Sequence, residues 1–221
     1  MRATNIASLA CAAVLVVTLG GVPLAEAKII NTPHDFSPAP WSGGEICKPC
    51  HIPHNAKETV TAAPLWNHEV TNATYTVYSS PTMDAIPGQP GGISKLCLSC
   101  HDGTIAIDSF GGQTGSVFMS PTSFAYMGTD LANDHPISFV YDSSLASTDG
   151  ELHDPTTTPS GLGGTIANDM LFNDRVECSS CHDVHVARGD GTCMACHFPN
   201  RDASLRKDNT GSALCLTCHD K

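Results

Sequence analysis

Aromatic and charged side chains are scarce in this chain of 221 residues, of which they make up 6% and 15%. So few aromatic residues give a domain of this size little material for an ordinary packed core. The low share of charged residues argues against a solvated, disordered chain. Basic residues are few as well, since 11 Lys and Arg stand against 22 Asp and Glu. The formal charge of −11 therefore argues against a nucleic-acid-binding surface.

Long apolar runs are absent beyond the first 27 residues, which have the pattern of an export signal. Arg2 supplies the positive start, residues 6–24 are apolar, and Ala25-Glu26-Ala27 is a small-x-small cleavage site. We therefore predict a signal peptide at 1–27 and a mature chain that begins at Lys28. An uncleaved membrane anchor is the alternative, but glycines and a proline interrupt the place where a spanning helix would continue. The mature protein is expected in the extracellular space or on the cell surface, or alternatively in the periplasm, without a membrane span.

Cysteine and histidine are abundant, with 11 of each, and Cys11 falls in the predicted signal peptide. The other ten cysteines form five copies of one pattern, Cys-x-x-Cys-His. The copies are Cys47, Cys50 and His51; Cys97, Cys100 and His101; Cys178, Cys181 and His182; Cys193, Cys196 and His197; and Cys215, Cys218 and His219. This is the c-type haem attachment signature. Two thiols three residues apart form thioethers with the two vinyl groups of one porphyrin edge, and the next His lies under the iron as its proximal ligand.

Three other uses of paired cysteines compete with this interpretation: a disulfide scaffold, a zinc site and a redox dithiol. None of them requires a His directly after the second Cys, which here occurs five times in five. Five covalently bound haems (haem c, iron) would leave fewer than 40 of the mature residues for each haem. We therefore predict a mostly irregular, coil-rich multihaem cytochrome c with short helices at the motifs, few short strands, and the haem stack as its core.

The motifs fall into two types. Type one carries a second His, as Cys-x-x-Cys-His-x-x-His at 47–54 and 178–185. Type two has the pattern Ser-x-Leu-Cys-Leu-x-Cys-His-Asp at 94–102 and 212–220, whose first residues, Ser94 and Ser212, are predicted N-caps of short helices. This order predicts a duplicated two-haem unit.

The mature chain, 28–221, is expected to form a single pentahaem domain. Its two-haem plan occurs over about 28–110 and again over 165–221, with the additional haem motif at 193–197 inserted in the second copy. A loop-rich connector of Gly, Ser, Thr and Asp, from Gly103 to about Gly164, joins the two copies.

Few regular elements are predicted outside the motifs. Apolar runs predict strands within 74–78 and 137–141, and a helical turn or two within 166–172. Residues 87–92 and 160–164 are rich in Gly and are predicted loops.

Six histidines remain besides the five proximal ones: His34, His54, His68, His135, His153 and His185. Six spare histidines for five irons favour two His ligands on every iron, and ordinary surface histidines are the alternative. Two imidazoles on opposite sides of one haem hold their Cα atoms about 12 Å apart, whereas three residues span at most about 10–11 Å. His54 therefore cannot serve the iron of His51, nor His185 that of His182. Each of them, if it is a ligand, clamps two haems together.

The spare histidines are unevenly distributed. The first half has two haems and three spare histidines, whereas the second half has three haems and one. Ligands are therefore expected to be donated across the duplication or between molecules. His34 lies in an arm bracketed by Pro33, Pro38 and Pro40, which suits an extended reach.

Several stretches together resemble the multihaem cytochromes of metal-reducing bacteria, above all the OmcE-type cytochromes that polymerise into extracellular nanowires. They are residues 34–37 (HDFS), 50–56 (CHIPHNA), 63–68 (APLWNH), 134–139 (DHPISF) and 176–185 (VECSSCHDVH). The resemblance implies bis-His haems in stacked and T-shaped pairs and a head-to-tail homopolymer in which His34 ligates a haem of the neighbour. The additional motif at 193–197 departs from the four-haem plan, and leaves open whether His68 or His153 serves the added iron.

We therefore expect a pentahaem protein that carries electrons along bis-His haems, as the subunit of an extracellular conductive filament. A six-coordinate iron has no open position for a substrate, so no catalytic residue is assigned and no enzyme activity is expected. Other cytochromes or extracellular metal oxides are the expected redox partners. The alternatives are a soluble periplasmic electron shuttle and a multihaem reductase with an open haem site.

Overall fold

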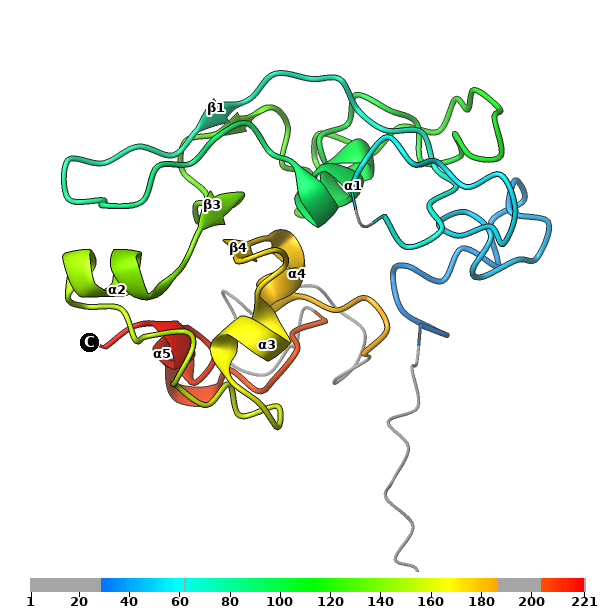
Figure 1. Cartoon of the computed structure of the whole chain (residues 1–221). Helices are drawn as coiled ribbons and strands as arrows, with labels where there is room; N and C mark the ends of the chain where they lie inside the picture. Colours follow the sequence, from blue (N-terminus) through cyan, green and yellow to red (C-terminus); the bar gives the residue numbers. More distant parts are fainter. Residues whose placement is uncertain (1–28, 62, 187–203, 221) are drawn as a thin grey trace, which may run out of the picture.

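The structure, a computed structural model, describes residues 29–61, 63–186 and 204–220 (Figure 1). The predicted signal peptide and the additional haem motif, with Cys193, Cys196 and His197, lie outside these residues. The expectations about them therefore stay predictions.

Most of the described chain is coil, which is compatible with the expected haem-cored fold. The helices are α1 (Gly92–His101), α2 (Ser143–Asp149), α3 (Ile166–Met170), α4 (Cys178–Cys181), η1 (Thr210–Ser212) and α5 (Cys215–Cys218). The strands are β1 (Thr76–Val77), β2 (Asp130–Leu131), β3 (Phe139–Val140) and β4 (Arg175–Val176). Three of the helices, α1, α4 and α5, carry attachment motifs. No helix within these described stretches is long and apolar enough to span a bilayer.

The predicted connector forms strand pairs with both halves of the chain. Strand β1 of the first half pairs in parallel with β2, and β3 pairs antiparallel with β4 of the second half. Strands β1 and β3 and helix α3 lie within the ranges predicted for them, and residues 160–164 are a loop as predicted. Helices α1, α4 and α3 follow one another through the middle of the molecule, where α4 contacts both of the others (Figure 1).

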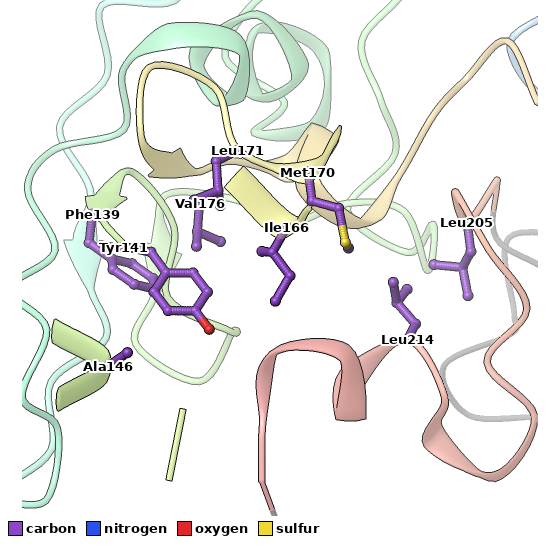
Figure 2. Packing of buried hydrophobic residues seen from close by; sticks show 9 residues of the cluster. All are labelled: Phe139, Tyr141, Ala146, Ile166, Met170, Leu171, Val176, Leu205 and Leu214. Atoms are coloured by element: carbon purple, nitrogen blue, oxygen red, sulfur yellow. The ribbon is translucent and has the colours of Figure 1, made fainter. Parts of the chain in front are cut away.

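Two small apolar clusters hold these elements together. The larger one gathers nine buried side chains around α3, whose Ile166 and Met170 face Val176 of β4 and Leu214 next to α5 (Figure 2). Cysteines of α4 and α5 pack against this cluster. The smaller cluster joins α1 to the β1–β2 ribbon. The apolar packing therefore positions the helices that carry the attachment motifs.

The predicted N-caps at Ser94 and Ser212 are wrong. Helix α1 begins at Gly92, so Ser94 lies inside it, buried, and its hydroxyl accepts a hydrogen bond from the backbone N–H of Cys178 (2.9 Å). Ser94 thus caps the neighbouring helix α4, whose first N–H groups have no partner within their own helix. Ser212 ends the short helix η1, and the side chain of Asn209 instead accepts from the N–H of Leu214, just before α5 (3.0 Å).

Candidate haem-binding sites

Each described attachment motif is one helical turn. We number the sites by motif order: site 1 ends at His51, site 2 at His101, site 3 at His182 and site 5 at His219, while site 4 lies outside the described residues. The N–H of the motif histidine donates to the carbonyl of the first cysteine at sites 1, 3 and 5, over 2.8, 3.0 and 3.0 Å. Site 2 is helical throughout. One turn brings residues i and i+3 to the same side, which is where two vinyl groups of one porphyrin edge need the thiols.

None of the eight described motif cysteines forms a disulfide. Burial, with smaller effects from neighbouring groups, raises the pKa of Cys50 to about 11 and that of Cys100 to about 12. Burial likewise raises the pKa of Cys218 to about 11. These side chains are therefore neutral thiols at physiological pH, unlike the low-pKa thiolates of catalytic or redox-active cysteines.

Backbone contacts fix the motif histidines. His51, His182 and His219 each form an isolated antiparallel bridge, to Trp66, Leu205 and Leu152 respectively. Backbone carbonyls also hold two of the rings, because Nδ1 of His51 donates to Pro64 (2.5 Å) and Nδ1 of His101 donates to Ala125 (2.8 Å). A carbonyl only accepts, so these rings carry their proton on Nδ1 and present a bare Nε2, the form that binds metals. Sequence reasoning missed these acceptors because a backbone carbonyl leaves no mark in the sequence.

Three pairs of imidazole rings lie at the spacing that a shared iron requires. The pairs are His51 with His185 (ring centres 6.0 Å apart), His34 with His101 (6.0 Å) and His135 with His219 (6.4 Å). Every pair joins one motif histidine to one spare histidine. A metal–imidazole bond of about 2.0 Å, with the ring centre about 1.1 Å behind its nitrogen, places two trans rings about 6.2 Å apart. The described residues therefore fit three bis-His haems.

The pair of His51 and His185 joins sites 1 and 3. His185 follows His182 of site 3 by three residues, yet its ring lies beside the motif histidine of site 1, with the two ring planes 26° apart. This agrees with the argument that His185 cannot reach the iron above His182. Nδ1 of His185 lies 3.2 Å from the carboxylate of Asp183, which leaves Nε2 for the other side of the ring. His54, the corresponding residue of site 1, is exposed.

His34 lies against a motif histidine of its own chain. Burial, followed by the nearby His101, His182 and His185, lowers the pKa of His34 to about 4, so its imidazole is neutral and able to bind metal. Nδ1 of His34 is buried without a hydrogen-bond partner among the described residues. A buried polar atom without a partner calls for one. The contact favours ligation at site 2 of the same chain over the ligation of a neighbouring chain's haem that the resemblance implies.

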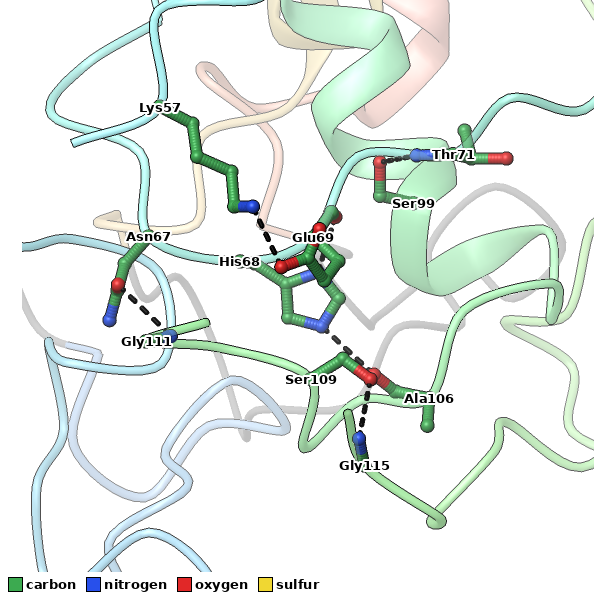
Figure 3. A network of polar contacts seen from close by, with 10 residues as sticks. All are labelled: Lys57, Asn67, His68, Glu69, Thr71, Ser99, Ala106, Ser109, Gly111 and Gly115. Atoms are coloured by element: carbon green, nitrogen blue, oxygen red, sulfur yellow. Dashed lines mark hydrogen bonds and ion pairs between the residues drawn. The ribbon is translucent and has the colours of Figure 1, made fainter. Parts of the chain in front are cut away.

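His68 is the most deeply buried of the spare histidines, with 2% of its surface exposed. Its Nδ1 lies 2.8 Å from the carbonyl of Glu69, and its Nε2 lies 3.0 Å from that of Ala106 (Figure 3). The sulfur of Cys100 at site 2 lies 3.5 Å from the same Nε2. In this arrangement His68 ties residues 67–69 to 106–111, beside site 2, rather than facing a motif histidine.

Both His135 and His153 lie near site 5. The ring of His135 pairs with His219, and its Nδ1 donates to the carbonyl of Pro136 (2.8 Å). The backbone N–H of His153 donates to the carbonyl of Cys218 (2.9 Å), and the hydroxyl of Tyr141 donates to the carbonyl of His153 (2.5 Å). His135 thus supplies a ring to site 5, whereas the contacts of His153 there are made by its backbone.

Sites 1, 2 and 3 are contiguous. The thiol of Cys97 at site 2 hydrogen-bonds that of Cys178 at site 3, and this bond raises the pKa of Cys97 and lowers that of Cys178. Cys50 of site 1 is close enough to Cys100 of site 2 to contribute to its raised pKa, after burial. The motifs of sites 1 and 3 therefore both lie beside that of site 2.

Within the stretches that the structure describes, no group of three or more His, Cys, Asp or Glu is arranged to hold a metal ion. A haem iron needs only two protein ligands, because the porphyrin supplies the other four. No family model matches the chain, and no curated protein matches it. The resemblance to nanowire cytochromes therefore rests on the sequence motifs.

Proposed function

We propose that the protein is a multihaem c-type cytochrome that carries electrons along bis-His haems. One observation supports this most strongly: three motif histidines each face a spare histidine at 6.0–6.4 Å, the spacing of two rings that share an iron. When bound, the haems would supply reversible one-electron redox chemistry.

The residues of the chain hold and orient these groups. The cysteine pairs of the helical turns would bind the porphyrin edges, and the carbonyls of Pro64 and Ala125 fix the tautomer of the two histidines that would be proximal ligands, His51 and His101. His34, His135 and His185 would supply the second iron ligand at sites 2, 5 and 1, and such six-coordinate irons would have no open position for a substrate. This arrangement favours electron transfer over the reductase alternative, and no catalytic residue is assigned.

We also propose where the protein acts and with what it exchanges electrons. The predicted signal peptide supports an exported protein, outside the cell or in the periplasm, with other cytochromes or extracellular metal oxides as redox partners. The resemblance supports a head-to-tail filament. The contact of His34 with His101 does not require a second copy of the chain, and is equally compatible with a monomeric shuttle.

Denaturing mass spectrometry of the purified protein tests the proposal directly. We expect a chain that begins at Lys28 and carries five haem masses. Four would mean that the motif at 193–197 is not loaded, and none would overturn the proposed function. Negative-stain electron microscopy of the same material then separates a filament from a shuttle.

A further inference from the structure

Asp102, which directly follows His101 of site 2, is a buried carboxylate with 1% of its surface exposed. It accepts hydrogen bonds from the hydroxyl of Tyr75 (2.5 Å), the N–H of Thr104 (2.7 Å) and the hydroxyl of Thr104 (2.8 Å). Burial, followed by the bond to Asp102, raises the pKa of Tyr75, so this hydroxyl keeps the proton that it donates. All three donors point at the carboxylate, as an ionised group requires.

No cation compensates this charge among the described residues. The ion pairs there join Lys57 to Glu69 and His185 to Asp183, and neither involves Asp102. Burying a carboxylate without an opposite charge is costly, and neutral donors offset only part of that cost. A positive charge at site 2 would supply the rest.

The carboxylate belongs to the residue next to those that would hold the haem of site 2. Asp102 is the C-cap of α1, directly after His101, and its backbone N–H donates to the carbonyl of Leu98 (2.8 Å). A porphyrin bound there carries one net positive charge at its centre when the iron is ferric and none when it is ferrous. The attraction of Asp102 therefore acts on the oxidised form alone, and at low dielectric it acts strongly.

We propose that Asp102 is a buried anion that stabilises the oxidised haem of site 2 and so lowers its reduction potential. The inference rests on the proposed function. The second copy of the same motif provides a natural comparison, because Asp220 directly follows His219 of site 5 but is exposed. Water and salt screen a charge there. Two copies of one motif thus give two sites of different potential.

Spectroelectrochemical titration of the holoprotein tests this role. In Asp102→Asn, we expect one fifth of the haem absorbance change to move to higher potential, by at least tenfold in the reduction equilibrium, which is 59 mV for one electron. Asp220→Asn is the matched control and should leave the titration curve unchanged. Tyr75→Phe removes one donor and leaves the carboxylate less neutralised, so the same fraction should move to lower potential.

The opposite directions separate an electrostatic role from a structural one, because simple loosening of site 2 would move both variants the same way. Mass spectrometry of each variant first counts the haems. Five haems with an unshifted curve in Asp102→Asn would overturn the role of Asp102 and leave the proposed function standing. If Asp102→Asn lost a haem, the Tyr75→Phe variant would decide. A reduction potential in Tyr75→Phe that rose or stayed unchanged would overturn the inference. A wild type without haem would overturn the proposed function itself.

Discussion

His34 has a buried ring nitrogen without a partner, 6.0 Å from the ring of a motif histidine. A buried imidazole in this position is expensive unless something binds it. A ligand on this nitrogen would remove that cost, and the ring of His34 lies beside that of His101. The lowered pKa of His34, about 4, keeps its ring neutral at physiological pH, so protons do not compete with a metal for the ring nitrogen.

Changing His34 to Ala should therefore expose one iron within each chain. We expect five haems still attached, with one of the five high-spin, because thioether attachment does not depend on the distal ligand. The optical spectrum at high dilution measures this, with His34→Met as a control that restores a six-coordinate iron through sulfur. A spectrum that stays wholly low-spin in the Ala variant would contradict the assignment. If the wild-type protein instead showed a high-spin signal only after its filaments were dissociated, His34 would be a ligand to a haem of the neighbouring chain.

His185 should serve site 1 rather than site 3, since the centre of its ring lies 6.0 Å from that of His51. His185→Ala is expected to make one of five irons high-spin. In a background that lacks the site 1 haem, with Cys47 and Cys50 both changed to Ala, the same substitution should add no high-spin signal. If His185→Ala produced a high-spin iron in both backgrounds, its ligand position would lie at another site.

Among the elements, helix α4 has only four residues and depends on its surroundings. So short a helix is not stable by itself, because ordering the first turn costs more conformational entropy than its hydrogen bond offsets. Ser94 of α1 satisfies its first N–H, and the capping box at Glu177 and Ser180 adds to this. The two attachment helices of sites 2 and 3 are thereby joined.

Ser94→Ala should lower the free energy of unfolding by about 1 kcal/mol, the usual cost of losing a helix cap. Ser212→Ala is the matched control from the second copy of the motif, since the hydroxyl of Ser212 caps neither η1 nor α5. Denaturant unfolding of the holoprotein, followed by circular dichroism, measures both. Equal stability of the two variants would show that the bond to Cys178 contributes nothing.

The elements also show what sequence reasoning can find. Helix α3 and strands β1 and β3 lie within predicted ranges because short apolar runs between loop residues mark them. Helix α2 was missed, although it had signals: Asp142 caps its start, and Gly150 ends it in the left-handed conformation. The bridges that anchor the motif histidines could not be predicted, because a single pair of residues has no periodicity.

At the scale of the whole molecule, the described sites are linked by contacts between their attachment motifs. Sites 1 to 3 are contiguous through their cysteines, and the larger apolar cluster connects α4 of site 3 with α5 of site 5. The motif sequence predicts the number of haems and their covalent attachment. The pairing of ligands depends on which segments meet in the fold: His34 and His101 lie in one copy, whereas His51 and His185 meet across the duplication.

The ligation of the irons in the fully oxidised holoprotein tests the account most directly. Near-infrared magnetic circular dichroism, together with electron paramagnetic resonance, reports the spin state and the axial ligands of every haem. The account predicts low-spin ferric iron with two imidazole ligands at sites 1, 2 and 5, where a spare histidine lies beside the motif histidine. A high-spin signal or a sulfur-to-iron charge-transfer band from three or more of the five haems would contradict it.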